Sequence, residues 1–140
     1  MIVFDTNVIS EALRPVPEPA VLAWLRSIPR SDIWTCTIVL AELFSGVDLM
    51  PVGKRQELLR EKMEQLVPAL FMNQVLLFDL QAARAYGPIL VARRAIGHPI
   101  GEIDAQIVAI ALANNATLAT RNIPDFENCG IQLVNPWEAD

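Results

Sequence analysis

The sequence has few of the residues that build disulfide, zinc or histidine-based sites. It contains two cysteines, Cys36 and Cys129, and one histidine in 140 residues. Neither cysteine belongs to a CxxC pair, so we expect reduced thiols rather than a disulfide framework or a zinc site. A covalent serine or cysteine mechanism is also disfavoured, because His98 is the sole imidazole and no Gly-x-Ser-x-Gly turn is present.

Long apolar runs and targeting signals are missing as well. The longest apolar runs, such as residues 107–113, are far shorter than the roughly 20 residues that cross a bilayer. The first five residues, Met-Ile-Val-Phe-Asp, carry no basic region and no cleavage site, which argues against a secretory signal. We therefore expect a cytoplasmic protein that does not contact membranes. Glycine-rich dinucleotide and P-loop motifs are absent too, so nucleotide cofactors are not expected.

The charge balance is acidic, with a formal net charge of −5. Such a chain is unlike proteins that hold nucleic acid on a broad basic surface. Carboxylates that converge on divalent cations can nevertheless create a local field that attracts phosphate. With 53% hydrophobic residues the chain can bury a full core, and no composition shift divides it, so residues 1–140 are predicted to form a single domain.

Strand patterns alternate with helix patterns along the whole chain. Strands are predicted at residues 2–4, 33–36, 75–78, 117–120 and 131–134. Helices are predicted at residues 8–13, 18–27, 37–50, 54–66, 80–95 and 102–115, with a possible disturbance at Gly87-Pro88. This alternation indicates an α/β fold with a mostly parallel five-stranded sheet that carries helices on both faces. In such folds ligands bind beyond the carboxyl ends of the strands.

Four acidic residues occupy positions where such a site would form. Asp5 directly follows the first strand, Asp104 lies in the first turn of a helix, and Asp125 follows the fourth strand. Glu42 lies within an apolar helix, where an unpartnered charge would be costly. Each residue alone has an ordinary explanation, because Asp and Glu cap helices and occupy turns and surfaces.

Their joint placement favours a site instead. Carboxylates brought within a few ångströms of one another repel, and hard divalent cations with oxygen ligands relieve that repulsion. The sequence therefore predicts a Mg²⁺ site, in which Mn²⁺ can substitute.

The ordered motifs resemble those of PIN domains. These motifs are Val3-Phe4-Asp5-Thr6-Asn7, Ala41-Glu42-Leu43, Ile103-Asp104-Ala105-Gln106-Ile107, and Thr120-Arg121-Asn122 with Asp125-Phe126. Within the family, the chain is most similar to the VapC toxins and their FitB-like members. The resemblance implies a Mg²⁺-dependent endoribonuclease that hydrolyses phosphodiester bonds, with transfer RNA as one candidate substrate. It also implies a homodimer and a cognate antitoxin that binds promoter DNA for the pair.

The resemblance carries roles over to individual residues. Asp5, Glu42 and Asp104 would hold the metal, and Thr6 or Asn7 together with Thr120 would support them through hydrogen bonds. Many relatives have a fourth acid two residues after the last threonine, where this chain has Asn122. Either Asn122 or the nearby Asp125 would take that place. The number of metal ions, one or two, therefore stays open.

Basic residues near the predicted site are candidates for contacts with RNA. Arg14 and Arg121 lie near the predicted mouth of the sheet, and Arg93 and Arg94 end a helix. Cations of this kind bind the phosphates of the nucleic acid backbone.

Two other functions are consistent with parts of the pattern. A non-catalytic binding module would use the same fold, with its acids serving only as helix caps. A phosphatase of the haloacid dehalogenase type also begins with a strand and an aspartate, but its Asp-x-Asp motif is not matched by Asp5-Thr6-Asn7.

Overall fold

The centre of the molecule is a sheet of five parallel strands. The computed structural model describes residues 1–139, and its strands are β1 (Ile2–Phe4), β2 (Ile33–Cys36), β3 (Val75–Leu76), β4 (Thr117–Ala119) and β5 (Leu133–Val134). Their order across the sheet is β3-β2-β1-β4-β5, and every neighbouring pair is parallel. The predicted α/β fold with a parallel five-stranded sheet is therefore confirmed.

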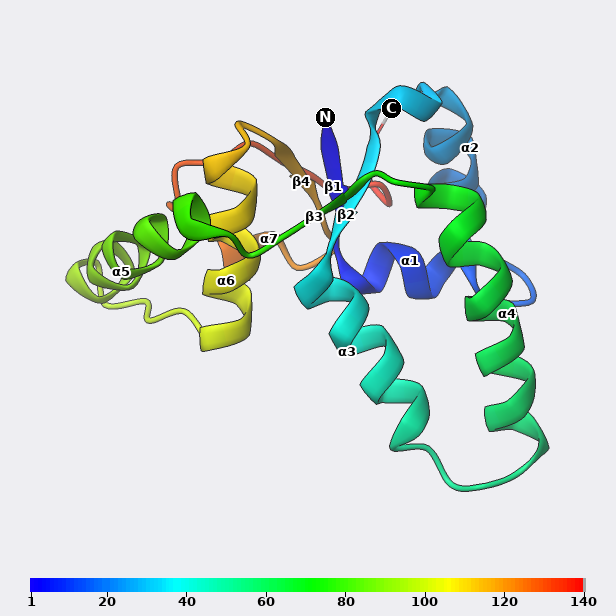
Figure 1. Cartoon of the computed structure of the whole chain (residues 1–140). Coiled ribbons are helices and arrows are strands. Elements are labelled where there is room, and N and C mark those ends of the chain that lie inside the picture. The colour runs from blue at the N-terminus through cyan, green and yellow to red at the C-terminus, as the bar shows by residue number, and fades with distance from the viewer. Residues whose placement is uncertain (140) are drawn as a thin grey trace.

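Helices cover the sheet on two sides. They are α1 (Thr6–Ala12), α2 (Pro19–Ser27), α3 (Thr37–Asp48), α4 (Lys54–Phe71), α5 (Leu80–Ala95), α6 (Glu102–Ala113) and α7 (Ile123–Phe126), with a short 3-10 helix, η1 (Arg30–Asp32). Figure 1 shows α5 and α6 on one side of the strands and α1, α2 and α4 on the other. The chain thus builds β1, β2 and β3 in one direction and returns past β1 to add β4 and β5.

Apolar burial holds these layers together. Val3 and Phe4 of β1 and Leu118 of β4 are almost fully buried. Helix α6 is buried over the continuous run from Ile107 to Ala111, as expected for a helix packed between the sheet and α5. The Phe4 ring lies 5.4 Å from Trp24 and 6.1 Å from Phe71, measured between ring centroids. Aromatic contacts of this kind lock α2 and α4 against the first strand.

Two prolines are tolerated where the sequence predicts a helix end or a disturbance. Helix α4 was expected to end near residue 66 but continues through Pro68 to Phe71. A proline removes one backbone donor, and here the full burial of Phe71 offsets that loss. Helix α5 likewise runs through Gly87-Pro88 without a break, since Ala82 and Ile89 anchor it on α6.

The strands β3 and β5 are shorter than predicted, and one helix was not predicted. β3 ends at Leu76 and β5 begins at Leu133, so each has only two paired residues. The connection after β4 contains α7, which starts after Asn122 with Pro124 in its first turn. Proline suits this position because its missing N–H would have no partner there.

Within residues 1–139, no helix combines the length and apolarity needed to cross a membrane. Cys36 and Cys129 are both buried free thiols, as the sequence predicts.

Candidate metal centre

The predicted site residues gather at the carboxyl edge of the sheet, where its winding direction changes. β1 ends at Phe4 and is followed by Asp5, and its neighbour β4 ends at Ala119 and is followed by Thr120. The chain leaves β1 toward β2 and leaves β4 toward β5, so the two connections diverge at this point. The crevice left between diverging connections is the usual ligand site of a parallel sheet.

Asp5 is held in place by three hydrogen bonds. Its Oδ1 accepts from the backbone N–H of Thr6 at 2.8 Å, and its Oδ2 accepts from Asn7 Nδ2 at 2.9 Å and Thr120 Oγ1 at 2.7 Å. The side chain is only 5% exposed. A carboxylate has about four acceptor positions, so these bonds orient Asp5 and leave it able to accept one further contact.

Asn7 and Thr120 belong to one hydrogen-bonded network around that carboxylate. Asn7 Nδ2 lies 3.2 Å from Thr120 Oγ1, and Asn7 Oδ1 accepts from the backbone N–H of Arg121 at 3.0 Å. The backbone N–H of Asn122 donates to Thr120 Oγ1 at 3.1 Å. The network ties α1 to the segment after β4, so the hydrogen bonds predicted for Thr6, Asn7 and Thr120 are present.

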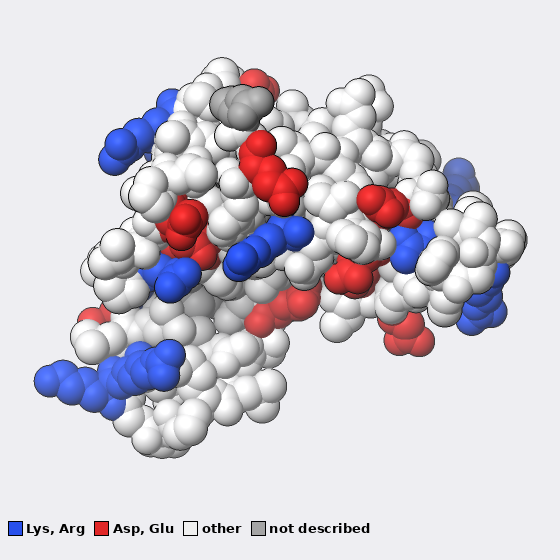
Figure 2. All heavy atoms as spheres, turned by 180° about the vertical axis from the view of Figure 1, so that it is seen from behind, with Lys and Arg blue, Asp and Glu red and all other residues white. Residues whose placement is uncertain are grey.

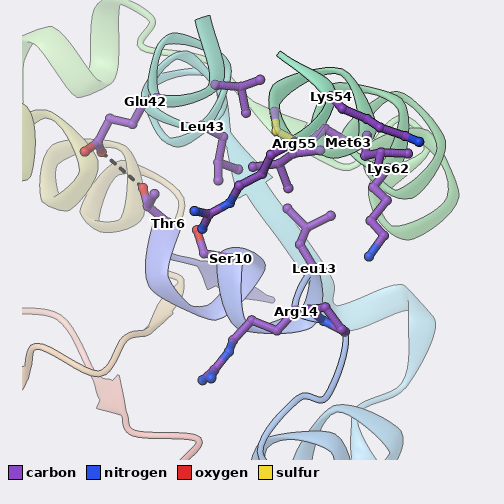
Figure 3. Close-up of a pocket in the computed structure, with 15 residues that line it drawn as sticks. Thr6, Ser10, Leu13, Arg14, Glu42, Leu43, Lys54, Arg55, Lys62 and Met63 are labelled. Atoms are coloured by element: carbon purple, nitrogen blue, oxygen red, sulfur yellow. Dashed lines mark hydrogen bonds between the residues drawn. The ribbon is translucent and has the colours of Figure 1, made fainter. Parts of the chain in front are cut away.

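Glu42 reaches the same edge from α3. Its Oε1 accepts from Thr6 Oγ1 at 3.3 Å, a contact drawn in Figure 3. The helix follows β2 directly, with Cys36 as its N-cap, so its first turns begin at the carboxyl edge of the sheet. Thr6 therefore contacts Glu42 through its side chain and Asp5 through its backbone.

Asp104 and Asp125 complete the acidic group. Asp104 is half-buried in the first turn of α6, which begins at the carboxyl edge because the helix runs back to start β4. Asp125 is exposed on α7. Asn122 is also exposed, and its side chain makes no hydrogen bond among residues 1–139.

The acidic side chains at this edge of the sheet shift one another's pKa values. Burial raises the pKa of Asp5, and the charge of Asp125 adds to that rise, while hydrogen bonds from Thr120, Thr6 and Asn7 oppose it. Burial also raises the pKa of Glu42, with further contributions from Asp5 and Asp104. The three carboxylates are therefore close enough for mutual repulsion, which disfavours their ionised forms.

Asp104 is affected in the same way. Burial raises its pKa most, followed by the charges of Asp5 and Asp125, and only the positive charge of Arg93 opposes the rise. Oxygen donors that repel one another are the ligand type suited to a hard divalent cation. The chemistry of the donor set thus fits Mg²⁺ or Mn²⁺, although no three Asp, Glu, His or Cys side chains of residues 1–139 are already gathered as a metal-binding group.

A groove of about 740 Å³ opens beside this acidic group, between α1, α3 and α4. Figure 3 shows Thr6 and Glu42 at one end of it and the ammonium groups of Lys54 and Lys62 at the other. Its floor is apolar, and four basic side chains line it: Arg14, Lys54, Arg55 and Lys62. The groove therefore combines apolar surface and positive charge, and it ends at the acidic group.

Comparison with known proteins agrees with this geometry. The PIN domain family matches residues 2–128, which is most of the chain. The chain belongs to the PIN-domain family.

Individual relatives cover nearly the full length of this PIN domain. The plasmid stability protein StbB of Pseudomonas syringae pv. tomato is 47% identical over 139 residues, which is 99% of this chain and 100% of StbB. VapC ribonuclease Y4jK of Sinorhizobium fredii is 40% identical, with 99% of both chains covered. Toxin FitB of Neisseria gonorrhoeae is 39% identical, covering 98% of this chain and 99% of FitB.

The fold of the PIN domain also has a solved counterpart. The structure of FitAB bound to an IR36 DNA fragment contains a chain that superposes with a TM-score of 0.92 at 38% identity. The match covers 100% of this chain and 98% of the other.

Arg93 lies inside the PIN domain, which corrects the prediction that it contacts RNA. Its side chain is only 5% exposed, and its guanidinium donates to three backbone carbonyls. The distances are 2.6 Å from Nε to His98 O, 3.2 Å from Nη1 to Asp125 O, and 2.6 Å from Nη1 to Glu127 O. These bonds join the end of α5 to the α7 segment and hold the guanidinium below the protein surface.

Substituting Arg93 by methionine is expected to lower the free energy of unfolding by about 3 kcal/mol, because three backbone carbonyls would lose hydrogen bonds from one charged, buried guanidinium. Arg94→Met is the matched control, since Arg94 is the exposed next residue, and it should change stability by no more than about 0.5 kcal/mol. Urea denaturation of both variants measures the difference. Equal stability of the two would contradict the role given to Arg93.

The other predicted RNA contacts, Arg14, Arg94 and Arg121, are exposed. Figure 2 shows acidic and basic side chains interspersed on the face opposite to the view of Figure 1. RNA binding by this PIN domain would thus depend on particular cations near the metal centre rather than on a broad basic face.

The sequence analysis did not identify two residues near the site, Glu11 and Trp137. Glu11 is 5% exposed and accepts from the backbone N–H of Glu18 at 2.7 Å, while Arg14 Nη1 lies 3.3 Å from its Oε2. Trp137 lies under the guanidinium of Arg121. The contact of Arg121 with Trp137 joins segments that come together only in the folded chain. Glu11 and Arg14, by contrast, are three residues apart, a spacing at which helical side chains meet and which the sequence does show.

Proposed function

We propose that residues 1–140 form a single PIN domain that hydrolyses RNA phosphodiester bonds as the toxin of a toxin–antitoxin pair. The observation that carries the proposal is that Asp5, Glu42 and Asp104 meet at the crevice of the sheet, where Thr6 hydrogen-bonds to both Asp5 and Glu42 and the charges disfavour one another's ionised forms. Such an arrangement lowers the stability of a fold, so its presence favours a functional role. The names of the relatives, a VapC ribonuclease and a toxin, support the same activity.

In this proposal Asp5, Glu42 and Asp104 hold Mg²⁺, and Mn²⁺ can substitute. The bound cation would lower the pKa of a water molecule and stabilise charge on the phosphoryl oxygens. Thr120 and Asn7 fix the orientation of Asp5 through Oδ2, and Thr6 supports Asp5 and Glu42 together. A preorganised set of ligands avoids reorganisation during the reaction.

Asp125 is proposed to take the fourth acidic place instead of Asn122. Its charge contributes to the raised pKa values of Asp5 and Asp104, so it faces the same space. The three backbone bonds of Arg93 hold the α7 segment and thereby the position of Asp125.

The decisive experiment is an RNA cleavage assay with protein freed of any co-purifying partner. Total RNA and transfer RNA are incubated with the wild type in Mg²⁺ or EDTA, beside Asp5→Asn as the control for contaminating nucleases. We expect cleavage only with Mg²⁺ and wild-type protein. A folded protein that neither binds Mn²⁺ nor cuts RNA would instead support the binding-module alternative.

An antitoxin is the proposed protein partner. The groove between α1, α3 and α4 combines an apolar floor with Arg14, Lys54, Arg55 and Lys62, so an acidic and apolar segment of that partner would complement it. Because Thr6 and Glu42 line one end, such a segment would lie against the metal centre and limit access to it. A homodimer, promoter DNA bound through the antitoxin, and a cytoplasmic location stay predictions from the family resemblance.

A further inference from the structure

Hydrogen bonds hold the backbone of Arg121 next to the residues that orient Asp5. Arg121 follows Thr120, whose hydroxyl donates to Asp5 Oδ2 at 2.7 Å. Its own backbone N–H donates to Asn7 Oδ1 at 3.0 Å. The main chain of Arg121 is therefore anchored on both sides to the residues that orient Asp5, whereas its side chain is exposed.

The guanidinium of Arg121 lies over the indole ring of Trp137. Its Cζ lies 5.2 Å from the centroid of Trp137, within the range of about 6 Å in which the cation–π attraction acts. Trp137 is partly buried against the core, and its backbone N–H donates to Asn135 Oδ1 at 3.1 Å. Trp137, in the segment after β5, thus provides an aromatic face beneath Arg121.

Stacking uses the face of a guanidinium and leaves its edge available. The five N–H donors of arginine lie in the plane of the group. Among residues 1–139, the Arg121 guanidinium makes no hydrogen bond or ion pair. Its in-plane donors are thus unused while its carbon lies over the indole, and a planar set of unused donors suits bidentate binding of a phosphate.

Arg121 shares a neighbouring carboxylate with a second cation, Arg14. Glu11 lies near both Arg14 and Arg121, and its pKa is lowered, first because the backbone N–H of Glu18 donates to it and then because of these two cations, while burial opposes the shift. These three side chains together carry one more positive than negative charge beside the acidic group. A polyanion that must approach several carboxylates needs such an excess.

We propose that Trp137 presents Arg121 to a backbone phosphate of the RNA strand, next to the phosphate that is cleaved. This inference rests on the proposed ribonuclease function and assigns Trp137 as a positioning residue and Arg121 as a substrate contact. A carboxylate of an acidic protein segment would also suit the planar fork. The anchoring of Arg121 to the Asp5 network is what favours the strand being cut.

The test compares variants that separate stacking from charge. Trp137→Leu and Arg121→Lys remove the stacked fork, Trp137→Phe keeps an aromatic face, and Arg121→Met removes the charge. Trp34→Leu and Arg26→Met are the controls. Trp34 lies beside η1, where its Nε1 donates to Ser31 O, and Arg26 is exposed at the end of α2.

Steady-state cleavage of one RNA oligonucleotide in Mg²⁺ is measured at several salt concentrations. Trp137→Leu and Arg121→Lys are expected to raise KM about 3- to 10-fold, with kcat within about twofold of the wild type. Trp137→Phe should retain most of the wild-type KM, and both controls should match it. Arg121→Met should also reduce the salt dependence of RNA affinity by about 0.7 in the logarithmic slope, the share of one phosphate contact, whereas Arg121→Lys should keep it.

Two measurements distinguish a loss of RNA binding from a loss of folded protein. Arg121→Lys leaves the indole in place, so its effect on KM does not depend on whether Trp137→Leu folds. In the Asp104→Asn background, RNA affinity measured by fluorescence anisotropy should weaken by the same factors. If the wild type cleaves RNA and both Arg121→Lys and Arg121→Met have its KM, the inference about Arg121 is wrong while the proposed function stands. If the wild type cleaves no RNA, the proposed function is wrong as well.

Discussion

Asp104→Asn is expected to lower kcat/KM for RNA cleavage by about 1000-fold and, at the same time, to raise the melting temperature of the metal-free protein. The catalytic loss follows because a metal ligand supplies several kcal/mol of stabilisation to the transition state, which corresponds to about three powers of ten in rate. The gain in stability follows because burial and the charges of Asp5 and Asp125 disfavour ionised Asp104. A neutral amide of similar shape removes that repulsion.

The matched control is Glu102→Gln. Glu102 lies in the same first turn of α6 but is exposed, so both substitutions remove one negative charge from the helix N-terminus. Only Asp104→Asn should change cleavage by more than about threefold, because a surface charge at this position contributes less than about 1 kcal/mol. Cleavage assays and thermal unfolding in EDTA measure the two effects. Equal cleavage by Asp104→Asn and wild type would remove Asp104 from the proposed ligand set.

Mg²⁺ or Mn²⁺ is expected to raise the free energy of unfolding of the wild type by about 2.7 kcal/mol at a concentration 100 times Kd, because it binds only the folded protein. The rise should be lost in Asp5→Asn and Asp104→Asn, whose ligand sets are incomplete, and kept in Glu102→Gln. Thermal unfolding across a metal titration measures it. A metal response that survives in Asp5→Asn would place the cation elsewhere.

The metal-free protein should show a matching dependence on pH. The pKa values of Asp5, Glu42 and Asp104 are raised by burial and mutual repulsion, so the folded protein binds protons more tightly than the unfolded chain. Their contribution to stability is present below the unfolded values, near pH 4, and is lost as pH rises through the folded values. In EDTA, Asp104→Asn should therefore become more stable relative to the wild type as the pH rises from 4 to 8. In Mg²⁺ this pH trend should reverse, because protonation competes with metal binding.

Local patterns predicted the framework well. The short apolar segments that precede Asp5 and Thr120 are strands with those residues at their carboxyl ends, and Glu42 and Asp104 lie on the predicted helices. These positions depend on chain periodicity and on the rule that parallel strands share an edge, and both can be seen in a sequence. The roles proposed for these acids stay predictions until they are tested by substitution.

The remaining features depend on packing between distant segments. Pro68 and Pro88 signal helix breaks locally, but burial of Phe71 and Ile89 outweighs that preference. Arg93 looked like a surface cation because it lies beside Arg94 near a helix end, and only the folded chain brings the α7 carbonyls to it. The stacking of Arg121 on Trp137 is invisible for the same reason.

The strand order β3-β2-β1-β4-β5 also bears on how the protein is made. A ribosome releases β1 early, yet β4, the strand that covers the other side of β1, appears more than one hundred residues later, and the bond from Thr120 to Asp5 spans 115 positions. A nascent chain shorter than that cannot complete the support of Asp5, however well its first half folds. Under the proposed function, Asp5 of a chain still being translated would lack this support until Thr120 had left the ribosome.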